Sequence, residues 1–190
     1  SDLAMGSLIQ DMRPTLDDFW GKENCSEVLN LSRPEMIRDI HRQYLRIGAD
    51  VVETNTFGAT GIVLGEFGLE DRVVEINHAA VKLAREAAQE FSTHAKPRFV
   101  AGSVGPTTKL PSLAHIGFDE MLASYVEQMK ALLDADVDVL LIETSQDILQ
   151  TKISIAAAFD AMAATGKRVP VQAQVTLQES GTMLLGTEIS

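Results

Sequence analysis

The 190-residue sequence has a single cysteine and few basic residues for its acidic content. It contains 16 Lys and Arg against 27 Asp and Glu, which gives a formal net charge of -11. Such a chain repels phosphate backbones and anionic lipid, so nucleic acid is not expected as a partner. The sequence has no apolar run near the roughly 20 residues of a membrane span, and its first residues do not resemble a secretory leader. We therefore expect a cytoplasmic protein without a membrane partner.

The sequence also lacks signatures for phosphate and for metal. Neither G-x-G-x-x-G nor G-x-x-x-x-G-K-[ST] follows any predicted strand, which argues against a nucleotide-binding sheet. The four histidines have no metal-ligand spacing to one another or to Cys25; they are His41, His78, His94 and His115. No base lies near Cys25 in the sequence to activate its thiol. The chain thus predicts no metal site of its own.

The apolar pattern predicts an α/β protein. The length suits about one domain, and 45% hydrophobic with 23% charged residues is a globular composition. Short runs rich in Val, Ile and Leu alternate with longer segments of helical period, which is typical of βαβα chains. Including a short first strand, the pattern predicts five βα steps, with strands at residues 2–4, 49–54, 98–102, 138–144 and 169–177.

Two helices have the clearest sequence signals. Ser32 and Glu35 predict a capping box at the start of one of them. Its apolar face is expected to contain Ile37, Ile40, Tyr44 and Ile47. A later helix is expected to bury the row formed by Ile148, Thr151, Ile155, Phe159 and Met162.

Two architectures accommodate this alternation. One is a complete five-stranded open sheet, and the other is an eight-stranded βα barrel of which the first five units are present. Length alone favours the open sheet, because a barrel needs about 250 residues.

Polar side chains follow the predicted strands at their carboxyl ends. In both architectures this edge of the sheet binds ligands, so one polar rim is expected from Asp2, Glu53, Glu143 and Gln174. Several carboxylates without a basic cluster suit an amine or another cation. The alternative is that each carboxylate only caps the helix that follows it. The Gly105-Pro106 pair in the loop from 103 to 117 is interpreted as a simple turn.

Several ordered strings resemble the homocysteine S-methyltransferase family, in the form of the homocysteine-binding domain of cobalamin-dependent methionine synthase. The resemblance covers essentially the whole chain. It rests on AMGSLIQ, PEMIRDIH, ETNTFGA, GPT, LIET and SGTMLLGT, at residues 4–10, 34–41, 53–59, 105–107, 141–144 and 180–187.

This resemblance implies a TIM barrel of which residues 1–190 form a partial homocysteine-binding domain. It implies that zinc held by cysteine thiolates binds the homocysteine sulfur, so that a thiolate can take a methyl group from methylcobalamin. Cobalamin and 5-methyltetrahydrofolate would act through other modules of the same polypeptide. The zinc ligands are expected beyond Ser190, so none is assigned here and the chain alone is expected to be inactive.

The resemblance also implies substrate contacts. Asp2 and Glu143 would hold the ammonium group of homocysteine, and amides around Leu3 and Ala4 would receive its carboxylate. The pocket would further be lined by Thr56, Phe57 and Thr144. Leu3 stands where the family usually has glycine. Two other functions stay open: a cobalamin-independent homocysteine methyltransferase, and a non-catalytic α/β module that binds an amino acid.

Overall fold

The computed structural model describes residues 5–188, in which four parallel strands form one sheet. Its strand order is β1-β2-β3-β4, with bounds Val51–Glu53, Phe99–Val104, Val139–Ser145 and Val171–Val175. Four long helices accompany the strands: α3 (Pro34–Arg46), α5 (Val73–Phe91), α6 (Phe118–Asp134) and α7 (Ile148–Thr165). The predicted βα alternation is confirmed for these strands, whereas the predicted strand at 2–4 lies outside the described residues.

The remaining elements are short. Three are α-helices, namely α1 (Met5–Asp11), α2 (Leu29–Ser32) and α4 (Gly61–Gly65). Three are single 3₁₀ turns, namely η1 (Ser26–Val28), η2 (Glu70–Arg72) and η3 (Pro111–Leu113). Within the described part of the chain, no helix combines the length and apolar content needed to cross a membrane.

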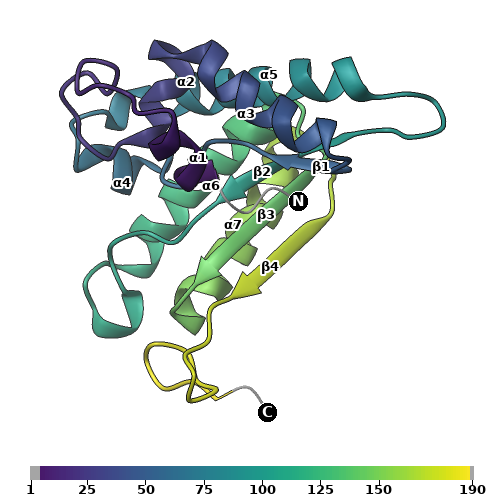
Figure 1. The fold of residues 1–190 in the computed structure, drawn as a ribbon. Coiled ribbons are helices and arrows are strands. Elements are labelled where there is room, and N and C mark those ends of the chain that lie inside the picture. Colours follow the sequence, from purple (N-terminus) through teal and green to yellow (C-terminus); the bar gives the residue numbers. More distant parts are fainter. Residues whose placement is uncertain (1–4, 189–190) are drawn as a thin grey trace.

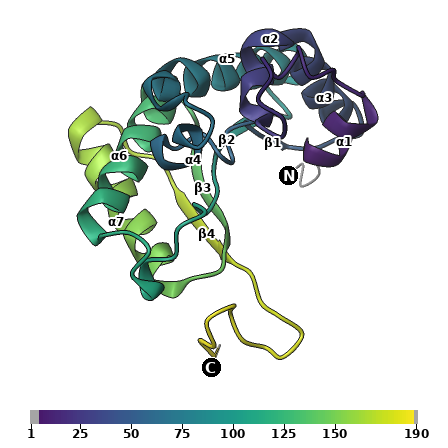
Figure 2. The ribbon, with the colours of Figure 1, turned by 90° about the vertical axis from the view of Figure 1, so that its left-hand side faces the viewer.

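The long helices all cover one face of the sheet (Figure 1), and in Figure 2 they form an outer layer around a concave inner face. Neighbouring strands follow sequence order, so the sheet has no point at which the winding reverses. A doubly wound open sheet needs such a reversal and helices on both faces. The arrangement is therefore part of a βα barrel, and the open sheet favoured by length alone is wrong.

Alternation along the strands separates the two faces. Val52, Val100 and Leu140 are fully buried against the helices in the main core. Their neighbours point to the opposite face, as successive strand residues must. There they line a cavity of about 240 Å³, formed by Val51, Glu53, Ala101, Val139, Leu141 and Gln172. This concave face corresponds to the interior of the barrel.

Two predicted features of the helices are wrong. The Ser32 hydroxyl does not cap α3, because Ser32 ends α2 and donates to the carbonyls of Asp18 and Val28. Ile47 is 82% exposed, since α3 ends at Arg46 and the chain turns away at the following glycine.

The buried face of α7 also differs from the predicted row. Phe159 is 58% exposed, although Thr151 and Met162 of the same row are buried. The side that is fully buried contains Ile153, Ala157, Ala158 and Ala161. Small side chains let a helix approach a sheet closely, so the alanines and not the larger Phe159 take this side.

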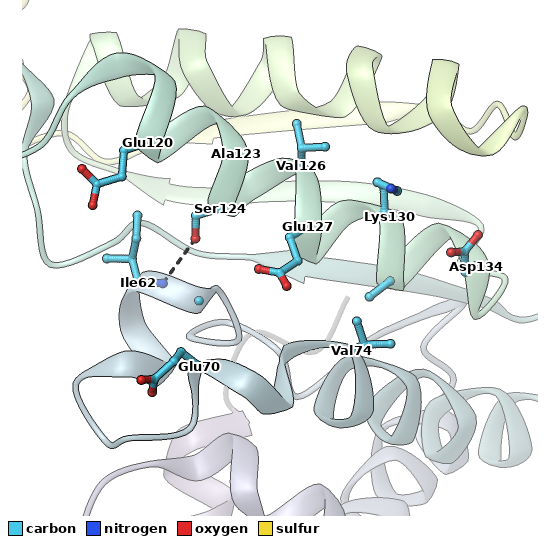
Figure 3. Close-up of a pocket in the computed structure, with 12 residues that line it drawn as sticks. Ile62, Glu70, Val74, Glu120, Ala123, Ser124, Val126, Glu127, Lys130 and Asp134 are labelled. Atoms are coloured by element: carbon cyan, nitrogen blue, oxygen red, sulfur yellow. Dashed lines mark hydrogen bonds between the residues drawn. The ribbon is translucent and has the colours of Figure 1, made fainter.

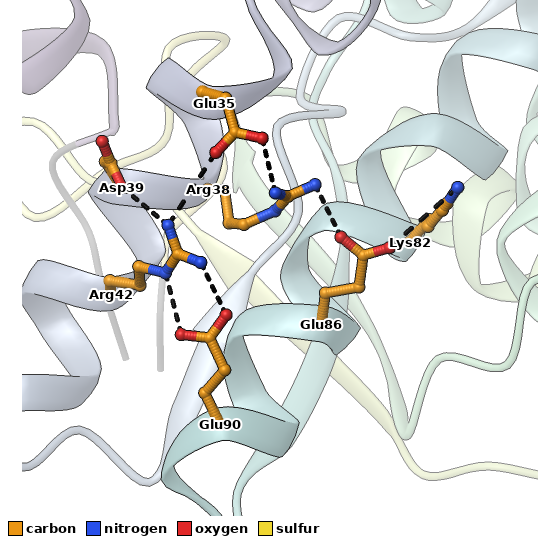
Figure 4. Close-up of polar contacts among 7 residues, drawn as sticks. All are labelled: Glu35, Arg38, Asp39, Arg42, Lys82, Glu86 and Glu90. Atoms are coloured by element: carbon orange, nitrogen blue, oxygen red, sulfur yellow. Dashed lines mark hydrogen bonds and ion pairs between the residues drawn. The ribbon is translucent and has the colours of Figure 1, made fainter.

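Ion pairs connect α3 to α5 on the outer surface (Figure 4). Arg42 donates to both carboxylate oxygens of Glu90, at 2.8 and 2.6 Å, and Arg38 pairs with Glu86 at 2.7 Å. Such exposed pairs contribute little to stability individually. The buried apolar contacts between the helices and the sheet remain the main source of stability.

A groove of about 870 Å³ lies between α4, η2, α5 and α6 (Figure 3). Glu70, Glu127 and Lys130 line it, and the Ile62 amide donates to the Ser124 hydroxyl across it at 3.2 Å. All of its lining residues belong to the helical layer. The groove is thus separate from the strand ends, where the polar residues of the sequence motifs gather.

Candidate functional site

Another cavity, smaller than the outer groove, lies at the carboxyl ends of β1, β2 and β3. Its volume is about 290 Å³, close to the lower end for small-molecule sites. It is lined by Met5, Gly6, Ser26, Glu53, Thr54, Asn55, Phe57, Ser103, Glu143 and Thr144. The structure thus brings together Glu53 and Glu143, the two carboxylates that end separate strands.

The other predicted site residues are placed differently. Asp2, Leu3 and Ala4 lie outside the described residues. Gln174 is on β4 and is not among the residues that line this cavity. Thr56 is fully buried and is not among the residues that line this cavity. Of the predicted substrate contacts, the cavity includes Phe57, Glu143 and Thr144.

A β-bulge presents Glu143 and Thr144 to the same cavity. In the pairing of β3 with β4, Ile142 is opposite Ala173 and Ser145 is opposite Val175, so β3 contains one extra residue. Thr144 has φ 56°, a left-handed conformation that is unusual for a β-branched residue. Successive side chains of a regular strand point to opposite faces. The bulge is therefore why both residues line the cavity, and strain of this kind gathers at functional sites.

The Glu143 carboxylate is held by a neighbouring strand. Ser103, on β2, donates its hydroxyl to Oε1 of Glu143 at 2.5 Å, and both side chains are buried. This contact orients the carboxylate without bringing a positive charge. The residues known to line the cavity include no Lys, Arg or His. The site is therefore suited to accept a cation.

The loop after β1 forms another wall of the cavity and is held in place by hydrogen bonds to residues 26–30. Asn55 donates to the Ser26 carbonyl at 2.8 Å, and Asn30 donates to the Asn55 carbonyl at 2.8 Å. The Gly58 amide donates to Oε1 of Glu27 at 2.7 Å. The sequence analysis did not identify Glu27. No motif indicates that this acidic residue is buried under the loop that contains Gly58.

The Gly105-Pro106 pair is more than a turn. The Gly105 amide donates to the Phe57 carbonyl at 3.0 Å, and a Cβ at position 105 would lie 2.6 Å from that oxygen. Only glycine permits this approach. Because Phe57 lines the cavity and is 41% exposed, Gly105 helps to set the shape of the wall.

The described residues do not fit a zinc site. Among residues 5–188, no group of three or more His, Cys, Asp and Glu side chains is placed to hold a metal ion. Cys25 is fully buried, and burial, followed by the nearby Glu27 carboxyl, raises the pKa of its thiol to about 12. In the absence of a metal, a thiol with this pKa stays protonated at neutral pH, and Cys25 belongs to no group of side chains placed to hold a metal among the described residues.

We expect Cys25 to resist alkylation. Relative to the ordinary thiol pKa of 9.0, a pKa of about 12 lowers the thiolate fraction at pH 8 roughly 1000-fold. Peptide mass spectrometry after iodoacetamide treatment measures this directly, with urea-unfolded protein as the control. Labelling of the folded protein at the rate of a free cysteine would show that the thiol is accessible and ionised.

A Glu27→Gln substitution is expected to change how stability depends on pH. Burial raises the pKa of Glu27 above its usual 4.5, so the folded chain retains a proton that the unfolded chain releases. The free energy of unfolding is therefore not reduced by Glu27 at low pH, and it falls as the pH rises above about 4.5, the usual pKa of this carboxyl. Glutamine still accepts from the Gly58 amide and releases no proton. The Tm of the variant relative to the parent should therefore rise between pH 5 and pH 8, by a few degrees as an order of magnitude. A constant difference would contradict a raised pKa of Glu27.

Fold and site together define this chain as part of a βα-barrel protein with an acidic cavity at its strand ends. The family model for Homocysteine S-methyltransferase matches residues 1–190, and the chain belongs to this family. The family suggested by the sequence motifs is thereby confirmed.

Similar proteins agree with this assignment. The chain is 43% identical over 188 residues to methionine synthases of Mycobacterium leprae and Mycobacterium tuberculosis. The alignments cover 99% of this chain and 16% of each relative, so the chain spans about a sixth of their length.

Solved structures of the homocysteine methyltransferase MmuM from Escherichia coli share the fold. The metallated form matches with a TM-score of 0.77 and 28% identity, over 97% of this chain and 65% of that one. The apo form matches with a TM-score of 0.64 and 26% identity, over 92% and 62%. These likenesses confirm that the sheet is part of a TIM barrel.

Proposed function

We propose that this chain provides the amino-acid-binding part of a homocysteine S-methyltransferase of the methionine synthase type, which methylates the thiol of homocysteine to give methionine. The observation that carries the proposal is the cavity in which Glu53 and Glu143 lie together among lining residues that include no basic side chain. An ammonium group is the cation that an amino acid brings to such a site.

The proposal assigns a task to each wall of the cavity. Glu143 and Asp2 are proposed to accept the ammonium group together. Backbone amides of Leu3 and Ala4 receive the substrate carboxylate. Phe57 offers a partly exposed ring to the methylene groups, and Thr144 closes the wall beside Glu143. Glu143 and Asp2 position the substrate in this proposal and take no part in the chemistry at sulfur.

Zinc and the methyl donor would come from outside the described residues. We place the zinc ligands in a part of the longer protein beyond Ser190, because the clusters needed for a metal do not occur within residues 5–188. The methyl donor is proposed to be methylcobalamin, recharged from 5-methyltetrahydrofolate by other modules of the same polypeptide in the cytoplasm. The higher identity to methionine synthases, 43% against 28% for the homocysteine methyltransferase MmuM, favours the methionine synthase type.

The longer protein that carries this chain provides the test. Isothermal titration calorimetry should show binding of L-homocysteine, and incubation with labelled methylcobalamin should yield labelled methionine. A methionine product from another donor only would support the cobalamin-independent alternative. Binding without any methyl transfer would support a non-catalytic module, and absence of binding would overturn the proposal.

A further inference from the structure

We propose that Ser103 is a positioning residue, which holds the Glu143 carboxylate toward the substrate ammonium group and is itself fixed by a closed ring of hydrogen bonds with Thr54 and Thr56. The inference rests on the proposed function of the cavity. It adds a residue that contacts Glu143 and not the reacting atoms.

The ring consists of three hydrogen bonds between the end of β2 and the segment after β1. The Ser103 amide donates to the Thr54 hydroxyl oxygen at 3.0 Å, and the two threonine hydroxyl oxygens lie 2.6 Å apart. The Thr56 hydroxyl donates to the Ser103 carbonyl at 2.7 Å. The ring thus begins and ends on the backbone of one residue.

The direction of every bond in the ring is determined by its ends. A backbone amide can only donate and a carbonyl can only accept. The single proton of Thr56 is used on the Ser103 carbonyl, so the proton between the threonines must come from Thr54. Both hydroxyl protons are therefore consumed inside the ring, and neither is left to donate to a ligand.

Burial makes this ring rigid. Thr54, Thr56 and Ser103 are each at most 3% exposed, and hydrogen bonds are stronger in such a low-dielectric interior. Gln128 of α6 is fully buried and donates to the Thr56 carbonyl at 2.8 Å, which connects the ring to the helical layer. The backbone of Ser103 is thus fixed on both its amide and its carbonyl, and its hydroxyl remains to orient Glu143 at 2.5 Å.

The ring also determines what the cavity wall offers a ligand. Thr54 lines the cavity, but its proton points to Thr56, so that hydroxyl presents a lone pair. Glu143 presents carboxylate oxygens beside it. A wall made of acceptors matches an ammonium group, which carries donors only. The same wall would disfavour a ligand that needs a donor at this position.

Two ligands distinguish positioning from a general structural role, both measured on the longer protein. Ser103→Ala removes only the hydroxyl and should raise the KM for L-homocysteine about tenfold, with kcat within about twofold. 4-Mercaptobutanoate is homocysteine without its amino group, so its Ki as a competitive inhibitor should not change. Thr54→Val, which breaks the ring, should raise the KM for homocysteine as well, whereas Thr54→Ser should retain the parental value.

Ser154→Ala is the matched control, since Ser154 is a buried serine of α7 whose hydroxyl donates to carbonyls within its own helix. Its KM should equal that of the parent. Equal weakening of both ligands by Ser103→Ala, or no weakening of homocysteine, would overturn the positioning role. If Glu143→Gln also leaves the KM for homocysteine unchanged, the proposed function fails; if only Glu143→Gln raises it, the positioning role alone fails.

Discussion

The Glu143→Gln variant is expected to bind L-homocysteine about 100-fold more weakly than the parent. Glu143 is only 9% exposed, and the described lining residues offer no other charge except Glu53. Removing one partner of a buried charge pair costs about 2–5 kcal/mol, and 1.4 kcal/mol corresponds to a tenfold change in affinity. Glutamine keeps the shape of the side chain and can still accept from Ser103, so the loss should reflect the missing charge. Isothermal titration calorimetry on the longer protein measures it.

Glu127→Gln makes the same change of charge at an exposed position of the outer groove. Its affinity for homocysteine should match the parent within about twofold. Equal affinities for the Glu143→Gln variant and the parent would mean that the ammonium group binds elsewhere. Equal losses in the two variants would mean that the overall negative charge, and not this carboxylate, attracts the substrate.

The Gly105→Ala variant is expected to lose both stability and affinity. The added methyl would lie 2.6 Å from the Phe57 carbonyl oxygen and 2.8 Å from two carbons of its ring. The Phe57 carbonyl belongs to the backbone and cannot move aside as the end of a flexible side chain can. The loop after β1 therefore has to move away from β2. Overpacking of this kind costs about 1–3 kcal/mol. Because Phe57 lines the cavity, we also expect affinity for homocysteine to fall about tenfold.

Gly117→Ala is the control for this prediction. No atom lies within 4 Å of the methyl group that it would add, and φ of Gly117 is -73°. Thermal unfolding and calorimetric titration of both variants are compared with the parent. A Gly105→Ala variant with parental stability and affinity would contradict the close approach between the two loops.

Local and periodic signals were sufficient to predict the strands and the two carboxylates at their ends. Alternation of apolar runs with helical periods depends on neighbouring residues, so it can be read along the chain. Glu53 and Glu143 each follow an apolar run, and parallel strands bring such ends to one edge. Their meeting in one cavity therefore follows from the predicted architecture.

The residues that sequence reasoning missed depend on contacts between distant segments. Ser103 is important because its hydroxyl donates to the Glu143 carboxylate, 40 positions later in the chain. Glu27 is important because its carboxyl accepts from the Gly58 amide, 31 positions later. Gly105 is required only by the approach of Phe57. The bulge at Thr144 is defined by its pairing with β4 and has no signature in the residues around it. No local pattern contains this information.

Length and periodicity did not choose between barrel and open sheet, whereas the family resemblance implied the barrel that the structure confirms. Chain length favours the smaller architecture, but length says nothing about the side of the sheet on which each helix packs. The sequential strand order and the single helical layer decide it. The exposure of Phe159 has the same origin, because helical periodicity alone does not tell which apolar side of α7 faces the sheet.

A crystal structure of the longer protein with L-homocysteine bound tests the central claim most directly. The amino acid is expected in the cavity between β1, β2 and β3, with its ammonium nitrogen within hydrogen-bond distance of the Glu143 carboxylate. The Ser103 hydroxyl is expected still to donate to that carboxylate. Homocysteine bound with its ammonium group away from Glu143, or outside this cavity, would contradict it.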